Sequence, residues 1–146
     1  MLHISRRSFA FAGTAVALAA CLPQLALAQA QPAQNRALFQ VTDNDPARWI
    51  MILNNIQNLR DGVGSEIVEI ELVAYGPGVA MLKADSSVRD RIDAALKTGV
   101  SVNACQNTMR GMKLVPADML PAIGYVPSGV VEVMRKQQKG WAYIRP

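Results

Sequence analysis

The chain has 146 residues, of which 51% are hydrophobic and 18% charged, a composition that fits one globular domain and excludes a largely disordered chain. Its formal net charge of +4 comes from Lys and Arg scattered among acidic residues, which argues against a nucleic-acid partner. The one histidine is His3, so a domain that begins after residue 28 contains none, which excludes a Ser-His-Asp or Cys-His catalytic arrangement and any histidine-ligated metal.

Residues 1–28 have the pattern of a secretory signal peptide. Arg6-Arg7 precedes an uncharged apolar run from Phe9 to Ala20. This run is shorter than the roughly 20 residues of a comfortable membrane span. Ala26-Leu27-Ala28 offers the small-x-small pattern that signal peptidase requires before Gln29. We therefore expect a periplasmic protein that begins at Gln29.

Two other features of this segment bear on export. Ser5-Arg6-Arg7-Ser8-Phe9 resembles a twin-arginine signal, although the general secretory route tolerates the same charges. Leu18-Ala19-Ala20-Cys21 resembles a lipobox, in which Cys21 becomes lipidated and the domain is anchored to a membrane. We rank this second, because residues 22–28 are largely apolar whereas a tether is expected to be polar.

The domain is expected over residues 36–146, after a polar, flexible lead-in over residues 29–35. Ala37 to Val41 predicts a buried strand. Asp43-Asn44-Asp45-Pro46 is typical of a helix start. The helix is expected to end at Gly62 and Gly64, and its apolar residues recur at helical spacing: Trp49, Ile52, Leu53, Ile56 and Leu59.

Glu66 to Tyr75 predicts a second strand, which Gly76-Pro77-Gly78 ends. One of its faces is wholly apolar and the other is mixed. Glu69 and Glu71 share the mixed face, where they are either paired carboxylates for acid–base chemistry or, as we prefer, a partly exposed and solvated strand face.

The remaining elements alternate in type, which predicts crossover connections. They are a helix capped by Asp85 or Ser86 that runs to Lys97, a strand over Val100–Ala104, a short helix over Gln106–Met112, a turn over Pro116–Leu120, a strand over Ile123–Val126, a helix capped by Ser128 that runs to Gly140, and a strand over Trp141–Ile144. The predicted fold is a three-layer α/β/α domain with a mostly parallel five-stranded sheet and flavodoxin-like layering.

Cys105 follows a predicted strand and precedes a predicted helix, at the edge of the sheet where such folds place ligands. A helix N-terminus there favours the thiolate. The alternative is a buried cysteine that acts as a small apolar residue. With Cys21 removed by processing, Cys105 has no partner in its own chain, and an unpaired thiol in an oxidising compartment favours a chemical role.

The segment Val102-Asn103-Ala104-Cys105-Gln106-Asn107-Thr108-Met109 resembles the cysteine segment of the DsrE/DsrF-like family of sulfur-handling proteins. Residues 126–132 and 138–146 resemble the closing helix and strand of that family. The resemblance implies a DsrEFH-like three-layer domain, assembly into homotrimers or hexamers, and a cysteine that passes persulfide sulfur. Only Cys105 is carried over as a catalytic residue. Predicted export separates this chain from cytoplasmic sulfur donors and acceptors.

Other residues at the same sheet edge are candidates for a ligand pocket beside the sulfur. They are Asp43, Asn44, Tyr75, Gly76, Asn103, Gln106 and Asn107. Helix capping and turn formation are the simpler explanations for several of them. Methionines 109, 112 and 119 more simply fill the core than bind Cu(I), and no phosphate-binding motif is present, so we expect no metal and no cofactor.

The preferred hypothesis is a periplasmic sulfur-binding or sulfur-transfer protein in which Cys105 carries sulfur as a persulfide, as a carrier rather than as an enzyme with conventional turnover. Its partners are expected to be small sulfur species or a sulfur-carrier protein, with no nucleic acid and no membrane unless Cys21 is lipidated. The alternative is a noncatalytic oligomeric binding module in which Cys105 is buried and structural. A redox sensor that dimerises through Cys105 is a third possibility, weakened by the lack of a resolving cysteine.

Overall fold

The computed structural model describes residues 35–63 and 68–146. Their strands form a single five-stranded sheet of order β4-β3-β2-β1-β5. The strands are β1 (Asn35–Val41), β2 (Val68–Ala74), β3 (Ser101–Cys105), β4 (Gly124–Val126) and β5 (Ala142–Ile144). All four strand pairings are parallel, which confirms the predicted sheet. The predicted signal, Cys21, the lead-in up to residue 34, Gly64 and Glu66 lie outside the described residues.

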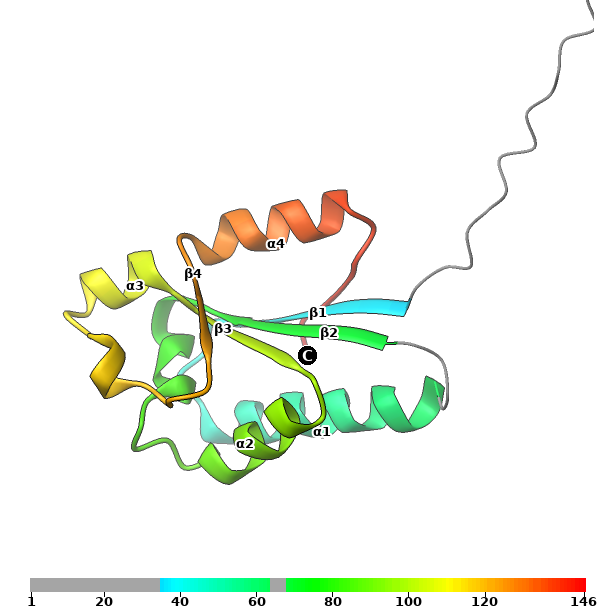
Figure 1. Ribbon diagram of the computed structural model, residues 1–146, viewed down its shortest axis with the longest axis horizontal. Coiled ribbons are helices and arrows are strands. Elements are labelled where there is room, and N and C mark those ends of the chain that lie inside the picture. Colours follow the sequence, from blue (N-terminus) through cyan, green and yellow to red (C-terminus); the bar gives the residue numbers. More distant parts are fainter. Residues whose placement is uncertain (1–34, 64–67) are drawn as a thin grey trace, which may run out of the picture. The chain divides into compact units, whose positions relative to one another are not determined.

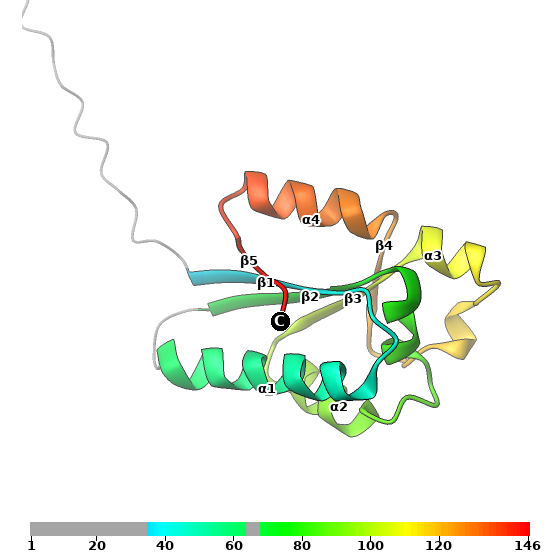
Figure 2. The same ribbon diagram turned by 180° about the vertical axis from the view of Figure 1, so that it is seen from behind.

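Helices cover both faces of this sheet. They are α1 (Pro46–Val63), α2 (Arg89–Lys97), α3 (Gln106–Gly111) and α4 (Gly129–Gln138), with two 3-10 helices, η1 (Gly76–Leu82) and η2 (Pro116–Asp118). Figures 1 and 2 show α1 and α2 against one face and α4 against the other, so the predicted three-layer arrangement is confirmed. None of the helices in the described part of the chain is long and apolar enough to cross a membrane.

The two faces of the sheet differ strongly in how they are filled. The face toward α1 and α2 holds most of the core, including Phe39, Leu72 and Ile92, each at most 1% exposed. The face toward α4 has a small buried apolar cluster, Leu38, Val73, Val126 and Val133. Among the described residues, α4 lies along that second face, and polar groups lie there between helix and sheet.

Glu71 lies on the α4 face and is 2% exposed, so the expectation of a solvated strand face was wrong for Glu71, whereas Glu69 is exposed as expected. Its Oε2 is 2.5 Å from Lys136 Nζ, and its Oε1 accepts a 2.9 Å hydrogen bond from Asn103 Nδ2. Lys136 also lies 3.8 Å from Glu132 and 4.1 Å from the centre of the Trp141 ring. A buried carboxylate needs partners of this kind, and here they fix α4 to the sheet.

Two helix starts differ in detail from the expectation. The second helix begins at Arg89 with Val88 at its N-cap position, so neither Asp85 nor Ser86 caps it. Ser86 N donates to Lys83 O and Arg89 N donates to Ser86 O, which makes residues 83–89 a pair of turns. Ser128 occupies the N-cap position of α4, but its side chain makes no capping hydrogen bond. At α1, by contrast, Asp45 Oδ1 accepts a 2.9 Å hydrogen bond from Ala47 N, as an acidic cap should.

Gly78 provides a test of how tightly η1 packs on β1. A Cβ atom at Gly78 would lie 2.4 Å from Val41 O, so Gly78→Ala must displace backbone, and we expect it to lower the free energy of unfolding by at least about 2 kcal/mol. Gly62→Ala in α1 is the matched control, because nothing lies within 4 Å of its added Cβ, and it should be neutral or stabilising by up to about 1 kcal/mol. Equal urea midpoints for the two variants would contradict this packing.

Candidate functional site around Cys105

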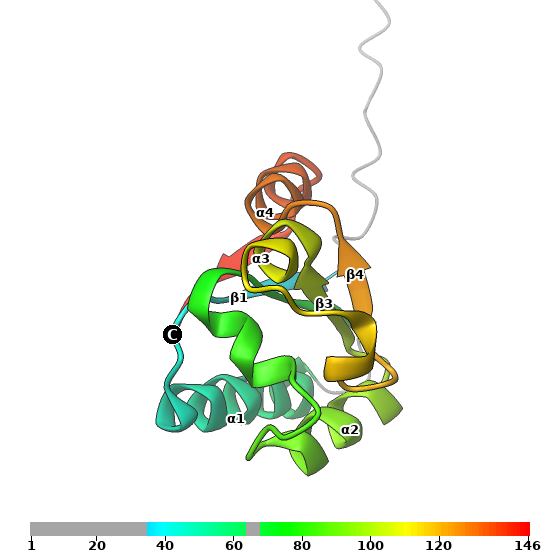
Figure 3. The same cartoon turned by 90° about the vertical axis from the view of Figure 1, so that its left-hand side faces the viewer.

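Cys105 is the last residue of β3 and the N-cap of α3, at the carboxyl edge of the sheet. This edge faces the viewer in Figure 3, where α3 lies in front of the sheet, near α4. The thiol is 4% exposed and is the only cysteine side chain in the described residues. The predicted position at a strand-to-helix junction is therefore the observed one, and the side chain is buried there.

Several hydrogen-bond donors converge on the sulfur. Gly129 N, at the first residue of α4, donates to Cys105 Sγ at 3.2 Å. Burial acts to raise the pKa of the Cys105 thiol, but hydrogen bonds from the Thr108 hydroxyl and from the backbone N–H groups of Thr108, Gly129 and Asn107 outweigh it. The pKa of the thiol is therefore below its ordinary value, and the thiolate is the form that this site stabilises.

The hydroxyl of Thr108 is oriented by the loop that follows β2. Gly76 N donates to Thr108 Oγ1 at 2.9 Å, which occupies an acceptor position of that oxygen. The hydroxyl proton is thereby available for the sulfur. Gly76 has a φ of +55°, a left-handed conformation that suits glycine and turns its N–H toward α3. Gly76, a predicted pocket residue, thus contributes to the site through its backbone N–H.

The ring of Tyr75 packs against the start of α4 beside the sulfur. A Cβ atom at Gly129 would lie 2.7 to 2.9 Å from three carbon atoms of Tyr75, so only glycine fits at this contact. The Tyr75 hydroxyl is held by Gln40 Nε2. Burial, and second the neighbouring Tyr143 hydroxyl, raise the pKa of Tyr75 above its usual value. Tyr75 is therefore a neutral wall of the site rather than a proton acceptor at neutral pH.

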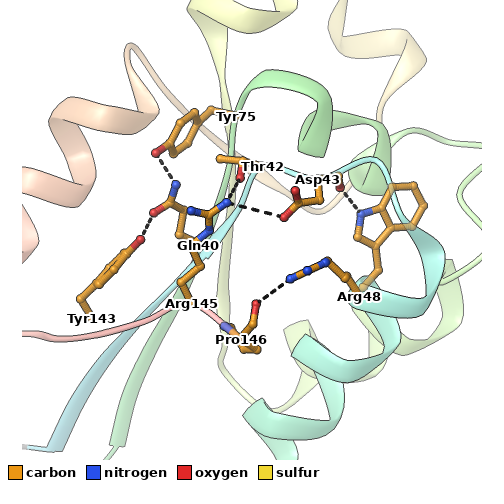
Figure 4. Close-up of polar contacts among 9 residues, drawn as sticks. Gln40, Thr42, Asp43, Arg48, Tyr75, Tyr143, Arg145 and Pro146 are labelled. Carbon is orange, nitrogen blue, oxygen red and sulfur yellow. Dashed lines mark hydrogen bonds and ion pairs between the residues drawn. The ribbon is translucent and has the colours of Figure 1, made fainter.

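A polar cluster adjoins this wall at the ends of β1 and β5. Figure 4 shows Gln40 between the hydroxyls of Tyr75 and Tyr143, with Arg145 beside it. Arg145 Nη2 donates to Thr42 Oγ1 at 3.1 Å and lies 3.8 Å from Asp43 Oδ2. Asp43, a predicted pocket residue, is thus part of this cluster.

The other predicted pocket residues are dispersed. Asn44 is exposed. Asn103 lies beneath α4, where it binds Glu71. Gln106 lines a cavity of about 220 Å³ with Arg110 and Tyr125, on the side of α3 that Met109 also lines. Asn107, by contrast, stays at the sulfur: its N–H is one of the donors that lower the pKa of Cys105, and it also donates to Pro127 O at 3.3 Å, which ties α3 to the loop before α4.

The site residues missed from the sequence are Gln40, Thr42, Thr108, Gly129, Tyr143 and Arg145. All but Gln40 and Thr42 stand in the segments that carry the family resemblance, so those segments already held the signal. Gln40 and Thr42 had none, because only the parallel pairing of β1 with β5 brings them to Tyr143 and Arg145.

The structure also bears on metal binding and on the methionines near Cys105. No group of three or more His, Cys, Asp or Glu side chains that could hold a metal ion occurs among residues 35–63 and 68–146. Met109 and Met119 are buried in the core on the α1 and α2 face, as predicted for gap-filling methionines. Met112 is 48% exposed, so the prediction that it fills the core was wrong.

Comparison with known proteins places this architecture. A family model described as "DsrE/DsrF-like family" matches residues 24–146. The solved structure of MTH1491, a protein of unknown function from Methanobacterium thermoautotrophicum, is 37% identical and superposes with a TM-score of 0.73, covering 76% of this chain and 98% of that one. BT1422 from Bacteroides thetaiotaomicron, also of unknown function, shares the fold at 16% identity, with a TM-score of 0.64 and coverage of 78% and 97%. No curated protein matches.

The role of Thr108 at the sulfur leads to a measurable change in acidity. Thr108→Val removes the hydroxyl donor, so we expect the pKa of Cys105 to rise by roughly 1 to 2 units, the equivalent of one hydrogen bond to a charged group. The pH dependence of alkylation by iodoacetamide gives this pKa. Thr108→Ser keeps the hydroxyl and should stay close to the wild type. An unchanged pKa in Thr108→Val would show that backbone donors alone stabilise the thiolate.

Proposed function

The chain belongs to the DsrE/DsrF-like family, and from this premise we propose that it is a sulfur-binding or sulfur-transfer protein in which Cys105 carries sulfur as a persulfide. The observation that carries the proposal is the set of donors on the sulfur. Gly129 N, 3.2 Å away, and the Thr108 hydroxyl together stabilise a thiolate in a domain that has no histidine to act as a base.

A thiolate of this kind is the nucleophile that sulfane-sulfur transfer requires. The Cys105 thiolate attacks the terminal sulfur of a donor R–S–SH, a bond forms between Sγ and that sulfur, and the bond between the two donor sulfurs breaks. The leaving group departs as R–S⁻, and the hydrogen stays on the transferred sulfur. Atoms and charge balance without an added oxidant or reductant, so the exchange needs no cofactor.

A second candidate function rests on the burial of the thiol. Cys105 is only 4% exposed, which favours a noncatalytic binding module in which the sulfur is structural. The two functions differ in whether a small reagent reaches the sulfur in the folded protein. The polar donors around the sulfur argue against a structural role, because placing such donors around an inert apolar thiol costs free energy.

We further propose that the protein is exported to the periplasm with residues 1–28 removed. The support is the Arg6-Arg7 pair before an apolar run and the small-x-small site that precedes Gln29. Lipid attachment at Cys21 is the alternative. In the periplasm, the sulfur donors and acceptors of Cys105 would be compounds or carrier proteins of that compartment.

Self-association is part of the same proposal. Val130 and Met134, one helical turn apart on α4, are 60% and 48% exposed. Adjacent apolar side chains on one helix face favour contact with a second copy of the chain.

Persulfide formation tests the main proposal. Reduced protein without residues 1–28, treated with polysulfide and then desalted, should gain one sulfur atom per chain, located at Cys105 by mass spectrometry of the intact protein and its peptides. Cys105→Ser, which removes the only cysteine left after residue 28, is the control and should gain none. Absence of the sulfur adduct in the wild type would overturn the carrier function.

Thiol accessibility separates the two candidates. If Cys105 is a carrier, iodoacetamide should label it in the folded protein, with a rate that levels off below the ordinary pKa of a thiol because that pKa is lowered. The number of adducts is counted by mass. Labelling that begins only after denaturation would instead establish the binding module.

A further inference from the structure

The polar cluster beside Cys105 contains a fixed pair of phenol groups. Gln40 is 7% exposed, and its amide is satisfied at both ends: Nε2 donates to Tyr75 Oη and Oε1 accepts from the Tyr143 hydroxyl. Figure 4 shows these three side chains in line, with Arg145 next to Gln40. Because a buried amide holds both hydroxyls, this part of the surface is preorganised rather than loosely arranged.

The sheet register aligns this cluster with the sulfur. Val41 pairs with Ala74, and Ala74 pairs with Ala104, so the residues that come next in the chain, Thr42, Tyr75 and Cys105, lie in a row at the carboxyl ends of β1, β2 and β3. All three follow the alternation of the α4 face. At about 4.8 Å between strands, Thr42 stands roughly 10 Å from Cys105, with Tyr75 between them.

Arg145 places a positive charge at the far end of this row. Both of its contacts, to Thr42 Oγ1 at 3.1 Å and to Asp43 Oδ2 at 3.8 Å, run through Nη2. The ion pair is long, and its side chains are 50% and 44% exposed, so it stabilises the fold little. A guanidinium has five N–H donors in a planar fork, which suits a carboxylate.

We propose that the row from Cys105 over Tyr75 to Arg145 is the donor site, and that its substrate is a low-molecular-weight organic persulfide bearing a carboxylate. This rests on the proposed carrier function of Cys105. The terminal sulfur of the donor meets the Cys105 thiolate, the connecting carbon chain lies along the Tyr75 ring, and the carboxylate binds Arg145.

An organic persulfide carries its carboxylate several bonds away from its reacting sulfur, so the molecule extends along the row from the thiolate to the guanidinium. The transfer is the same balanced exchange as above: R–S⁻ leaves with its carboxylate still bound to Arg145, and the reaction is neither an oxidation nor a reduction.

The experiment compares two donors that differ in this one group. The persulfides of 3-mercaptopropionate and 2-mercaptoethanol, each prepared from its disulfide and sulfide, are mixed with reduced protein, and the second-order rate of sulfur gain at Cys105 is followed by mass spectrometry. We expect the carboxylate donor to react about tenfold faster, as a charge-assisted hydrogen-bonded pair implies, with the preference falling at high salt.

Variants assign this preference to Arg145. Arg145→Met should bring the ratio of the two rates close to one, and Arg145→Lys should keep part of it, since the charge remains without the fork. Arg110→Met on α3 removes the same charge outside the row and should keep the full ratio, which separates a specific contact from an effect of net charge. Thr42→Val, which removes the anchor of the guanidinium, should lower the ratio partly.

The outcomes separate this inference from the function on which it rests. Equal rates for the two donors in the wild type, or an Arg145→Met ratio equal to that of the wild type, would overturn the donor site while leaving Cys105 as a sulfur carrier. Failure of polysulfide and of both persulfides to load Cys105 would overturn the carrier function and the donor site together.

Discussion

The hydrogen bond from Gly129 N to Cys105 Sγ is the contact on which the site depends, because it joins the end of β3 to the start of α4. It forms only if α4 approaches the sheet so closely that Gly129 touches the Tyr75 ring, and a side chain at that position would prevent the approach. The same contact therefore helps the Thr108 donors to lower the pKa of the thiol, and it fixes the position of the Tyr75 ring and of the start of α4. Electrostatics and packing are coupled here through one backbone N–H.

The other end of α4 explains how that approach is maintained. The apolar cluster on the α4 face is small. Glu71 on the same face forms an ion pair with Lys136, with 2.5 Å between Oε2 and Nζ, and accepts a 2.9 Å hydrogen bond from Asn103 Nδ2. A buried ion pair adds little net stability compared with an apolar contact, but it is directional, and it defines where along the sheet the helix lies. With Lys136 held and Gly129 seated on the sulfur, α4 has two fixed points, which is what a preorganised donor to a thiolate requires.

The sequence predicted the sheet, its helices and the place of Cys105, because these follow from local periodicity and from residues at the ends of elements. It did not predict the partners of Cys105, since Gly129 is 24 residues away and reaches the sulfur only through the crossover geometry. Asn103 was expected near the sulfur because it lies at the same sheet edge, yet its amide donates instead to Glu71 on the neighbouring strand. Which residues face one another across strands depends on register, and local patterns do not encode register between strands so far apart in the chain.

Burial and acidity at Cys105 together narrow the chemistry that this thiol can perform. A disulfide between two chains requires two sulfur atoms about 2 Å apart. Cys105 is 4% exposed, beneath the Tyr75 ring and α4, so its sulfur cannot come this close to the Cys105 sulfur of a second chain unless the domain opens. This argues against a sensor that dimerises through Cys105. A reagent that presents one sulfur atom at the tip of a narrow molecule has a much smaller steric demand, and a stabilised thiolate attacks it without a base. The buried position and the lowered pKa of Cys105 thus favour transfer of a single sulfane sulfur over formation of a disulfide between two chains.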